Sequence, residues 1–394
     1  MIFLPSLYVY SQQEGPYRST FLFSVTVTLV TVPLGWLLAN ACFRSSAQEV
    51  ECFYFLPIDD LDYENLKRPI LCLVLGALVF TAYYIYEVNT VPLFYLLRNP
   101  GDYLELVTLR EESFKLLDSR FTYIYFILRS VLYPFLILVT LGCYLRTRER
   151  LWFVLFSVTT FMGLFFASLS LAKAPVSIIF AVIGLFTYLY RRGKLGKKLV
   201  ITILVLVLLF PFFVVLGIST DSVTVQMATL ALASRVFYMP AEVVYYYFEV
   251  FPQQTNFLHG RSIDKLARAL GEAPFPIENH VGTYAYPQYQ DTVSANGAFI
   301  AYLYADFGVA GVLLGGILAG FVMQSVGIWV IRRRKTIITI AAYAFMMYAF
   351  WFLHSISLAV VIASNGVALI IILTVLLSRT RGKESSAPVR YQGF

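Results

Sequence analysis

Charged residues are scarce in this chain of 394 amino acids, because Asp, Glu, Lys and Arg together make up only 13% of it. Hydrophobic residues account for 59%, and the mean hydropathy of +0.73 is well above that of ordinary soluble domains. The apolar residues gather in long runs and do not alternate with polar ones. This composition excludes a typical soluble enzyme and indicates a protein that crosses a membrane several times.

Cysteine and several well-known site motifs are also lacking. The chain has 4 cysteines, and their spacings suggest neither a disulfide framework nor a CxxC metal site. It contains no GxGxxG, no GxxxxGKS/T and no HExxH pattern, which hold nucleotide phosphates or zinc in other proteins. We therefore expect neither a cofactor nor a metal site.

Long apolar runs supply the main structural signal. A helix needs about 20 apolar residues to cross a hydrocarbon core of about 30 Å. By this criterion we count about nine runs, at 21–43, 69–86, 121–145, 151–171, 176–190, 200–216, 299–331, 337–353 and 358–377. Because backbone polar groups find no water in lipid and these runs do not alternate, they predict an all-α bundle of transmembrane helices over one membrane domain, 1–394, and exclude a barrel.

Positive charge predicts how the chain is oriented. Of the 30 Lys and Arg residues, 19 lie in the segments 44–68, 146–150, 191–198, 332–335 and 379–394. The positive-inside rule places these segments in the cytoplasm and leaves the loop 89–120 and the large loop 218–297 outside. The net charge of +7 is mostly this bias, so the expected partners are membrane lipids with anionic headgroups and not nucleic acid.

The segment 230–251 is ambiguous. It is long enough to cross the membrane, yet it contains Arg235, Pro240 and Glu242. One more crossing would invert every later loop, so we expect this segment to lie on the outer membrane surface or to re-enter it. The large external loop should also hold a short amphipathic helix from Ile263 to Leu270, which Gly271 can terminate.

Cations beside the apolar runs are candidates for binding phosphate, namely Arg110, Arg129, Lys173, Arg235 and Arg261. Arg129 falls about nine residues into a run, where a cation is costly unless it faces a cavity or a partner. Pairing with a helix carbonyl, or reaching to the interface, is the alternative. Lys173 lies in a short external turn, where it could anchor the helix at the interface or bind a phosphate.

The large external loop also carries candidate glycan-binding and proton-accepting residues. Tyrosine rings can stack on sugars, and the candidates are Tyr284, Tyr286, Tyr289 and Tyr302, although an aromatic belt at the interface explains tyrosines equally well. As proton acceptors we rank His280 first, followed by His259, Glu278 and Asp291. A solvated histidine without chemistry is the alternative. The glycines at 308, 311, 315, 316 and 320 are explained by close helix packing.

Several of these motifs occur in an order that resembles a known family. Small residues precede a basic one in 168–175, an Arg precedes a Tyr-rich stretch in 235–252, and Phe-Leu-x-Gly occurs in 257–261. Asp306-Phe307-Gly308-x-x-Gly311 then leads into a glycine-rich run. This order resembles the Wzy-type O-antigen polymerases, which are bacterial oligosaccharide repeat unit polymerases. The related ligases carry His-Asn before Gly-x-x-Gly, whereas here Ala295 precedes Asn296.

The resemblance implies a GT-C-like helical bundle and a membrane glycosyltransferase at the external face of the bacterial cytoplasmic membrane. Such an enzyme moves a glycan from one polyprenyl diphosphate to a sugar hydroxyl on another, so donor and acceptor are both lipid-linked. A chain-length regulator would be a further partner. The five cations would hold the diphosphate without a metal, and one of the four proton acceptors would activate the hydroxyl.

Two other functions stay open besides an O-antigen ligase-like transferase. A polysaccharide or lipid transporter would also need many spans and cations, but transporters commonly show internal repeats and broken helices near the midplane. We find no repeat in this sequence. A purely structural membrane protein would not need cations at the external ends of its helices, where Arg129, Lys173 and Arg235 lie.

Overall fold

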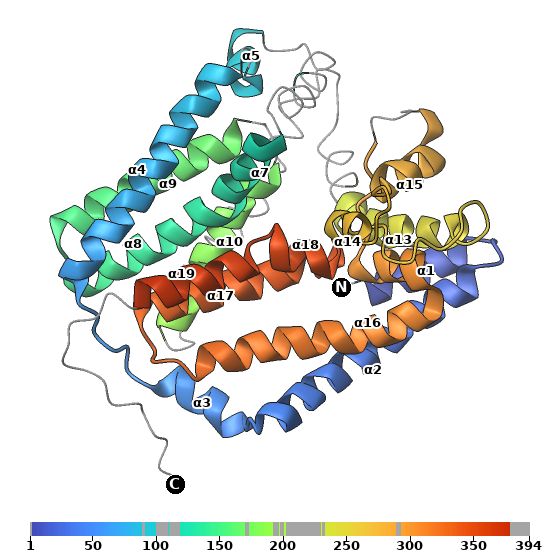
Figure 1. Cartoon of the computed structure of the whole chain (residues 1–394), viewed down its shortest axis with the longest axis horizontal. Helices are drawn as coiled ribbons and strands as arrows, with labels where there is room; N and C mark the ends of the chain where they lie inside the picture. Colours follow the sequence, from blue (N-terminus) through green and yellow to red (C-terminus); the bar gives the residue numbers. More distant parts are fainter. Residues whose placement is uncertain are drawn as a thin grey trace. The chain divides into compact units, whose positions relative to one another are not determined.

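The structure is a computed structural model, shown in Figure 1. It describes residues 2–88, 91–99, 109, 119–169, 173–191, 197, 201, 230, 233–288 and 293–378. Within these residues the secondary structure is helical and no strand occurs. The predicted all-α class is therefore confirmed.

The chain divides into two compact units, each built from segments that are distant in sequence. Unit 1 comprises Met1–Ser46, Gln226–Trp329 and Phe350–Ile362, and unit 2 comprises Ala47–Val225, Val330–Ala349 and Ala363–Phe394. Both units carry long apolar helices. The prediction of one membrane domain over 1–394 stays a prediction.

The helices of unit 1 include α1 (Phe3–Gln12), α2 (Arg18–Phe43), α13 (Met239–Val250), α14 (Asp264–Ala269), α15 (Ile277–Ala285) and α16 (Phe299–Ile331), with the π-helix η2 (Ser234–Tyr238) and the 3-10 helix η4 (Phe352–His354). The helices of unit 2 include α3 (Ala47–Phe55), α4 (Tyr63–Glu87), α5 (Pro92–Arg98), α7 (Ser119–Ile127), α8 (Tyr133–Thr147), α9 (Arg150–Ser168), α10 (Lys173–Tyr190), α17 (Ile337–Trp351) and α19 (Val367–Ser378), with the π-helix η1 (Leu128–Leu132). The helix α18 (Leu358–Ala363) lies at a boundary between the two sets of segments, and the last two residues of α16 and of α17 likewise belong to the segments of the other unit.

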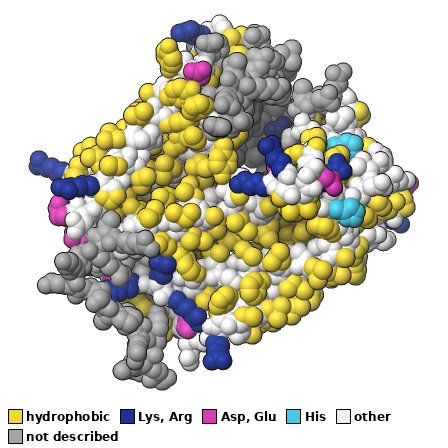
Figure 2. Space-filling view, in the orientation of Figure 1, with side chains coloured by type: hydrophobic (Ala, Val, Ile, Leu, Met, Phe, Trp, Pro, Cys, Tyr) yellow, Lys and Arg dark blue, Asp and Glu magenta, His cyan; other side chains and the backbone are white. Residues whose placement is uncertain are grey.

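Within the residues that the structure describes, seven helical stretches are long and apolar enough to span a membrane. They are Arg18–Phe43, Tyr63–Glu87, Phe121–Thr147, Arg150–Ser168, Phe299–Ile331, Ile337–His354 and Leu358–Ser378. The run 176–190 forms a shorter apolar helix, Pro175–Tyr190, and the run 200–216 lies outside the described residues except for Ile201. Figure 2 shows hydrophobic side chains over much of the face that it draws. The chain is thus a multi-pass membrane protein in composition and helix length.

The ambiguous segment 230–251 adds no long span among the described residues. Its main helix, α13, continues directly from η2, and this helical stretch, which holds Arg235, Glu242 and Glu249, is not one of the apolar spans. Val244, Tyr247 and Phe248 of α13 are fully buried in the core of unit 1. In the same large loop, α14 forms one residue inside each predicted end, and Gly271 follows it with a positive φ of 76°.

Glycines set the close packing of α2 against α16, which run side by side in Figure 1. A Cβ added at Gly35 would lie 2.1 Å from the carbonyl oxygen of Ile317, and one at Gly320 would lie 2.0 Å from the carbonyl oxygen of Val32. Both distances are far below van der Waals contact, so only glycine allows these backbones to approach so closely. The prediction that this stripe serves packing is confirmed here.

The run 299–331 is not one straight helix, because Gly308 breaks it with φ 63° and ψ −154°. A Cβ added at Gly311 would lie 2.4 Å from the carbonyl oxygen of Leu303. A Cβ added at Gly315 would lie 2.4 Å from Cδ2 of the same leucine. In a straight helix, residues eight apart are separated by about 12 Å along the axis. The segment before Gly308 therefore folds back over the segment that follows it.

Basic loops of unit 2 contact one another, in agreement with their assignment to one side of the membrane. Lys335 is buried and donates to the carbonyl oxygens of Tyr54 at 2.8 Å and Leu56 at 3.0 Å. Arg146 donates to Asp60 through Nε at 2.7 Å and Nη2 at 3.0 Å. These contacts join the segments 44–68, 146–150 and 332–335.

Candidate functional site

A loop of unit 1, residues 257–262, is attached to α16 just before its bend. The carboxylate of Asp306 is the centre of this attachment, and the residue is only 3% exposed. Its Oδ1 accepts the N–H of Gly260 at 3.0 Å and the N–H of Ser262 at 3.3 Å, while Oδ2 accepts the Ser262 hydroxyl at 2.5 Å. A buried carboxylate is costly unless its oxygens are satisfied, and these three donors satisfy them.

Two backbone hydrogen bonds complete the attachment. The N–H of Leu258 donates to the carbonyl oxygen of Ala305 at 2.9 Å, and the N–H of His259 donates to that of Asp306 at 3.0 Å. His259 and Gly260 have φ values of 52° and 93°, a left-handed conformation that is unfavourable for histidine. The hydrogen bonds to α16 offset this cost and hold the loop against the helix.

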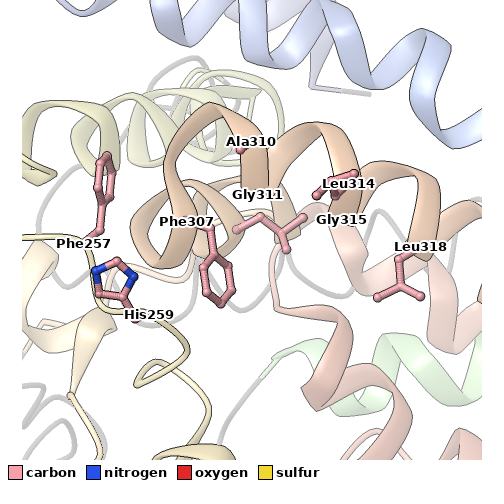
Figure 3. A pocket seen from close by; sticks show the side chains of 9 residues that line it. Phe257, His259, Phe307, Ala310, Gly311, Leu314, Gly315 and Leu318 are labelled. Carbon is pink, nitrogen blue, oxygen red and sulfur yellow. The ribbon is translucent and has the colours of Figure 1, made fainter.

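The imidazole of His259 lies at one end of an apolar groove of about 600 Å³. Figure 3 shows Phe257 and His259 at one end of this groove and Leu318 at the other. Other residues that line the groove are Phe307, Gly311 and Leu314. Leu314 is 71% exposed and Leu318 54% exposed, so the groove runs along an accessible face of α16 and ends at a polar group.

His280, the first choice from sequence as a proton acceptor, has a partner in the structure. Its Nε2 lies 2.9 Å from the hydroxyl of Thr255, and its ring packs edge-on against Phe275 with centroids 5.1 Å apart. Partial burial lowers the pKa of His280 below its usual value. The imidazole of His280 is therefore neutral at pH 7. His280 does not line the groove along α16, whereas His259 is exposed and does line it.

Arg261 also belongs to the loop 257–262. Its Nε lies 3.2 Å from a carboxylate oxygen of Glu272, and its guanidinium lies 5.8 Å from the centre of the Phe275 ring. The Arg261 side chain is 38% exposed. An exposed ion pair of this kind is weak, so the guanidinium can exchange its carboxylate partner for an anionic ligand.

Tyr302 does not form a glycan-stacking surface, which corrects the prediction. The residue is 4% exposed, and its hydroxyl donates to the carboxylate of Glu278 at 2.9 Å. Its neighbour Tyr247 is fully buried and donates to the carbonyl oxygen of Ala295 at 2.8 Å. Tyr302 thus orients Glu278 from within the core.

Tyr284 and Tyr286 remain accessible. Tyr284 is 38% exposed and donates to Glu249 at 3.3 Å, and Tyr286 donates to Glu242 at 3.5 Å. The fourth predicted glycan-binding tyrosine, Tyr289, lies outside the described residues, as does the predicted proton acceptor Asp291.

Two of the predicted phosphate-binding cations lie on π-helices, and the sequence supplies the cause. Arg129 is in η1 and Arg235 is in η2, and in each case a proline follows five residues later, at Pro134 and Pro240. A proline ring clashes with the carbonyl group four residues earlier, and the wider π-turn relieves that clash. The guanidinium of Arg129 lies about 5 Å from the rings of Tyr125 and Phe126.

The five predicted cations do not all fall in the same unit. Arg235 and Arg261 belong to unit 1, whereas Arg129 and Lys173 belong to unit 2. Lys173 is the first residue of α10, but its side chain is outside the described part of the chain, as is all of Arg110. A joint diphosphate clamp therefore stays a prediction.

Metal ligands do not gather in the described part of the chain. No group of three His, Cys, Asp or Glu side chains there is arranged to hold an ion. The acidic spacing Asp60-Leu61-Asp62 resembles a metal motif, but Asp60 pairs with Arg146, and Asp62 caps α4 by accepting the N–H of Asn65 at 3.1 Å. Both carboxylates are thus engaged in holding the fold.

Sequence reasoning overlooked the part that Asp306 plays. One signal could have revealed it: an acid inside an apolar run needs a partner, because an unpaired carboxylate is expensive there. Its partners lie 44 to 46 residues earlier in the chain, and no local pattern indicates them.

No protein-family model, curated protein or solved structure matches this chain.

Proposed function

We propose that this chain is a membrane glycosyltransferase that polymerises oligosaccharides carried on polyprenyl diphosphate, at the external face of the bacterial cytoplasmic membrane. The observation that supports it best is the groove along α16, which is apolar over its length and ends at His259. A lipid-linked oligosaccharide has the same division into an apolar tail and a polar head. The groove thus suits the tail, with the reacting groups near the loop 257–262.

The diphosphate requires cations where it departs. Arg261 lies two residues from His259, and its exposed guanidinium can bind phosphate oxygens through two N–H groups at once. Arg235 is exposed in the same unit. We assign the diphosphate to these two cations first, with Arg110, Arg129 and Lys173 as further candidates.

The reaction needs a proton acceptor for the attacking hydroxyl. In the proposed step, the acceptor oxygen bonds to the anomeric carbon of the donor sugar, and the bond from that carbon to the diphosphate oxygen breaks. The hydroxyl proton passes to the imidazole of His259, and the polyprenyl diphosphate leaves as an anion. His259 is preferred over His280 because it is exposed at the groove, whereas His280 contacts Thr255.

The test is polymerisation by the purified full chain in lipid nanodiscs, with a lipid-linked oligosaccharide as the only substrate. We expect a ladder of longer glycans. His259→Ala should lower the rate by about 100-fold, within the 10²–10⁴ range of general base catalysis, while His354→Ala serves as a control for loss of a histidine. No ladder from the wild-type chain would refute the polymerase, and full activity of His259→Ala would refute the assigned base.

A second candidate, a glycan or lipid transporter, is favoured by one observation. Two apolar runs are interrupted by glycines with positive φ, at Gly308 (63°) and at Gly366 (82°), which separates α18 from α19. Interrupted spans are common in transporters. Movement of a fluorescent lipid-linked glycan between leaflets of proteoliposomes, without change in glycan length, would support this candidate over the polymerase.

A further inference from the structure

Three tyrosine hydroxyls converge on one carboxylate in unit 1. Tyr238 and Tyr246 donate to Oε1 of Glu242 at 3.1 and 3.4 Å, and Tyr286 donates to Oε2 at 3.5 Å. Tyr238, Glu242 and Tyr246 are spaced four residues apart, which places them on one helical face. Tyr286 comes from the end of α15, so the cluster joins two helices.

The tyrosine rings pack edge to face and keep part of their surface accessible. Tyr246 contacts Tyr284 and Tyr286, with ring centroids 6.2 and 6.0 Å apart. Tyr284 is 38% exposed, and the rings of Tyr238, Tyr246 and Tyr286 are partly exposed. Edge-to-face packing holds such rings in fixed orientations, so their free surfaces are preorganised for a ligand.

Tyrosine hydroxyls donate to both carboxylates of this cluster, Glu242 and Glu249. In the described part of unit 1, neither Glu242 nor Glu249 forms an ion pair, and tyrosine hydroxyls are their hydrogen-bond donors. Burial raises the pKa of Tyr238 and Tyr286 to about 12, so these phenols stay protonated and donate. A phenol orients a carboxylate without neutralising it, which leaves lone pairs that can accept further hydrogen bonds.

We propose that Tyr238, Glu242, Tyr246, Tyr284 and Tyr286 form a saccharide-binding platform. The flat ring faces receive the C–H face of a sugar, and Glu242 accepts hydrogen bonds from its hydroxyl groups. A diphosphate would be repelled by Glu242 and Glu249, so the platform takes the glycan and not the anionic end of a lipid-linked substrate. Its identification with the glycan of that substrate rests on the proposed function.

The test measures binding of free oligosaccharide, released by mild acid from the lipid-linked pool of the host cell, to the purified full chain in nanodiscs. Isothermal titration reports the affinity, and saturation-transfer NMR reports which sugar protons touch the protein. We expect Glu242→Gln to weaken binding about tenfold or more and Tyr286→Phe about threefold or more. Tyr86→Phe, an exposed tyrosine of unit 2, is the matched control.

Each outcome decides the proposal. Weaker binding in Glu242→Gln and Tyr286→Phe, with Tyr86→Phe unchanged and all three variants monodisperse with wild-type melting temperatures, supports the platform. The saccharide platform is overturned if the wild type does not bind glycan or if Tyr286→Phe binds it with unchanged affinity. It is also overturned if choline displaces the glycan, because the aromatic rings and carboxylates would then form a site for a quaternary ammonium ion. If the wild type binds glycan through the platform but forms no ladder, the polymerase alone is refuted. If the wild type forms a ladder and the Glu242→Gln and Tyr286→Phe variants bind glycan as tightly as it does, the platform alone is refuted.

Discussion

Removing the Asp306 carboxylate should release the loop 257–262 from α16. In Asp306→Ala, three donors lose their acceptor: the N–H of Gly260, the N–H of Ser262 and the Ser262 hydroxyl. A hydrogen bond to a charged group contributes about 1.5–3 kcal/mol, but the three share one carboxylate and are not additive. We therefore expect a loss of about 3–5 kcal/mol in the local stability of this loop.

Asp306→Asn separates charge from geometry. The amide keeps one carbonyl oxygen for the two N–H groups, and its NH2 group can donate to the Ser262 oxygen. We expect this variant to lose only about 1–2 kcal/mol, the difference between charged and neutral hydrogen bonds. Asp264→Ala, which removes an exposed carboxylate close to the loop, is the control and should have no effect on the loop.

Amide hydrogen exchange measures this loss directly. The amides of Leu258, His259, Gly260 and Ser262 are all hydrogen-bonded to residues 305 and 306. Every 1.4 kcal/mol corresponds to a tenfold change in the opening equilibrium, so Asp306→Ala should exchange these amides more than about 100-fold faster. Wild-type exchange rates at these amides in Asp306→Ala would refute the conclusion that Asp306 holds the loop.

Four further predictions follow from the same structure. Gly35→Val should destabilise the chain by about 2 kcal/mol or more in thermal unfolding, because the added Cβ meets backbone atoms of α16 that cannot shift. Gly76→Ala is the control and should be neutral, because the Cβ added at Gly76 lies in open space. A cysteine at Gln288 should react with an impermeant thiol reagent in intact cells and the native Cys52 only in inverted vesicles, and the reverse pattern would show that the orientation is wrong. The pKa of His280 is lowered in the folded chain, so the unfolded chain binds this proton more readily. The stability that His280 confers is therefore present above about pH 6.5 and is lost as the pH falls below that value. This pH dependence of the stability should be absent from the variant His280→Gln. Polymerisation should persist in excess EDTA, and rescue of a chelated sample by magnesium or manganese would reveal a metal site.

Much of the helical architecture was predictable because hydrophobic runs encode it directly. Spanning segments must be apolar and helical wherever lipid surrounds them, so local composition alone predicts them. The stop of α14 at Gly271 was also predictable, since glycine adopts a positive φ without a Cβ clash. The contacts of Lys335 and Arg146 in unit 2 bring three of the basic segments together, and the orientation of these segments across the membrane stays a prediction.

The candidate site depended on contacts that no local pattern encodes. Gly308 reads as one more small residue in a packing stripe, but its backbone folds Leu303 back onto Gly311 and helps to shape the groove. Tyr302 has the same composition-based signal as Tyr284, yet one is buried and the other exposed, because helix packing decides which side of each ring meets solvent.

The sequence by itself determined that this chain is a helical membrane protein with cations and tyrosines in its longest polar loop, because composition and periodicity depend on neighbouring residues only. The tertiary structure decided which of those side chains meet. Asp306 and Ser262 are 44 residues apart and hydrogen-bonded, as are Glu242 and Tyr286. Such pairings arise from the three-dimensional packing of whole helices, which brings together residues whose chemistry is visible in the sequence but whose proximity is not.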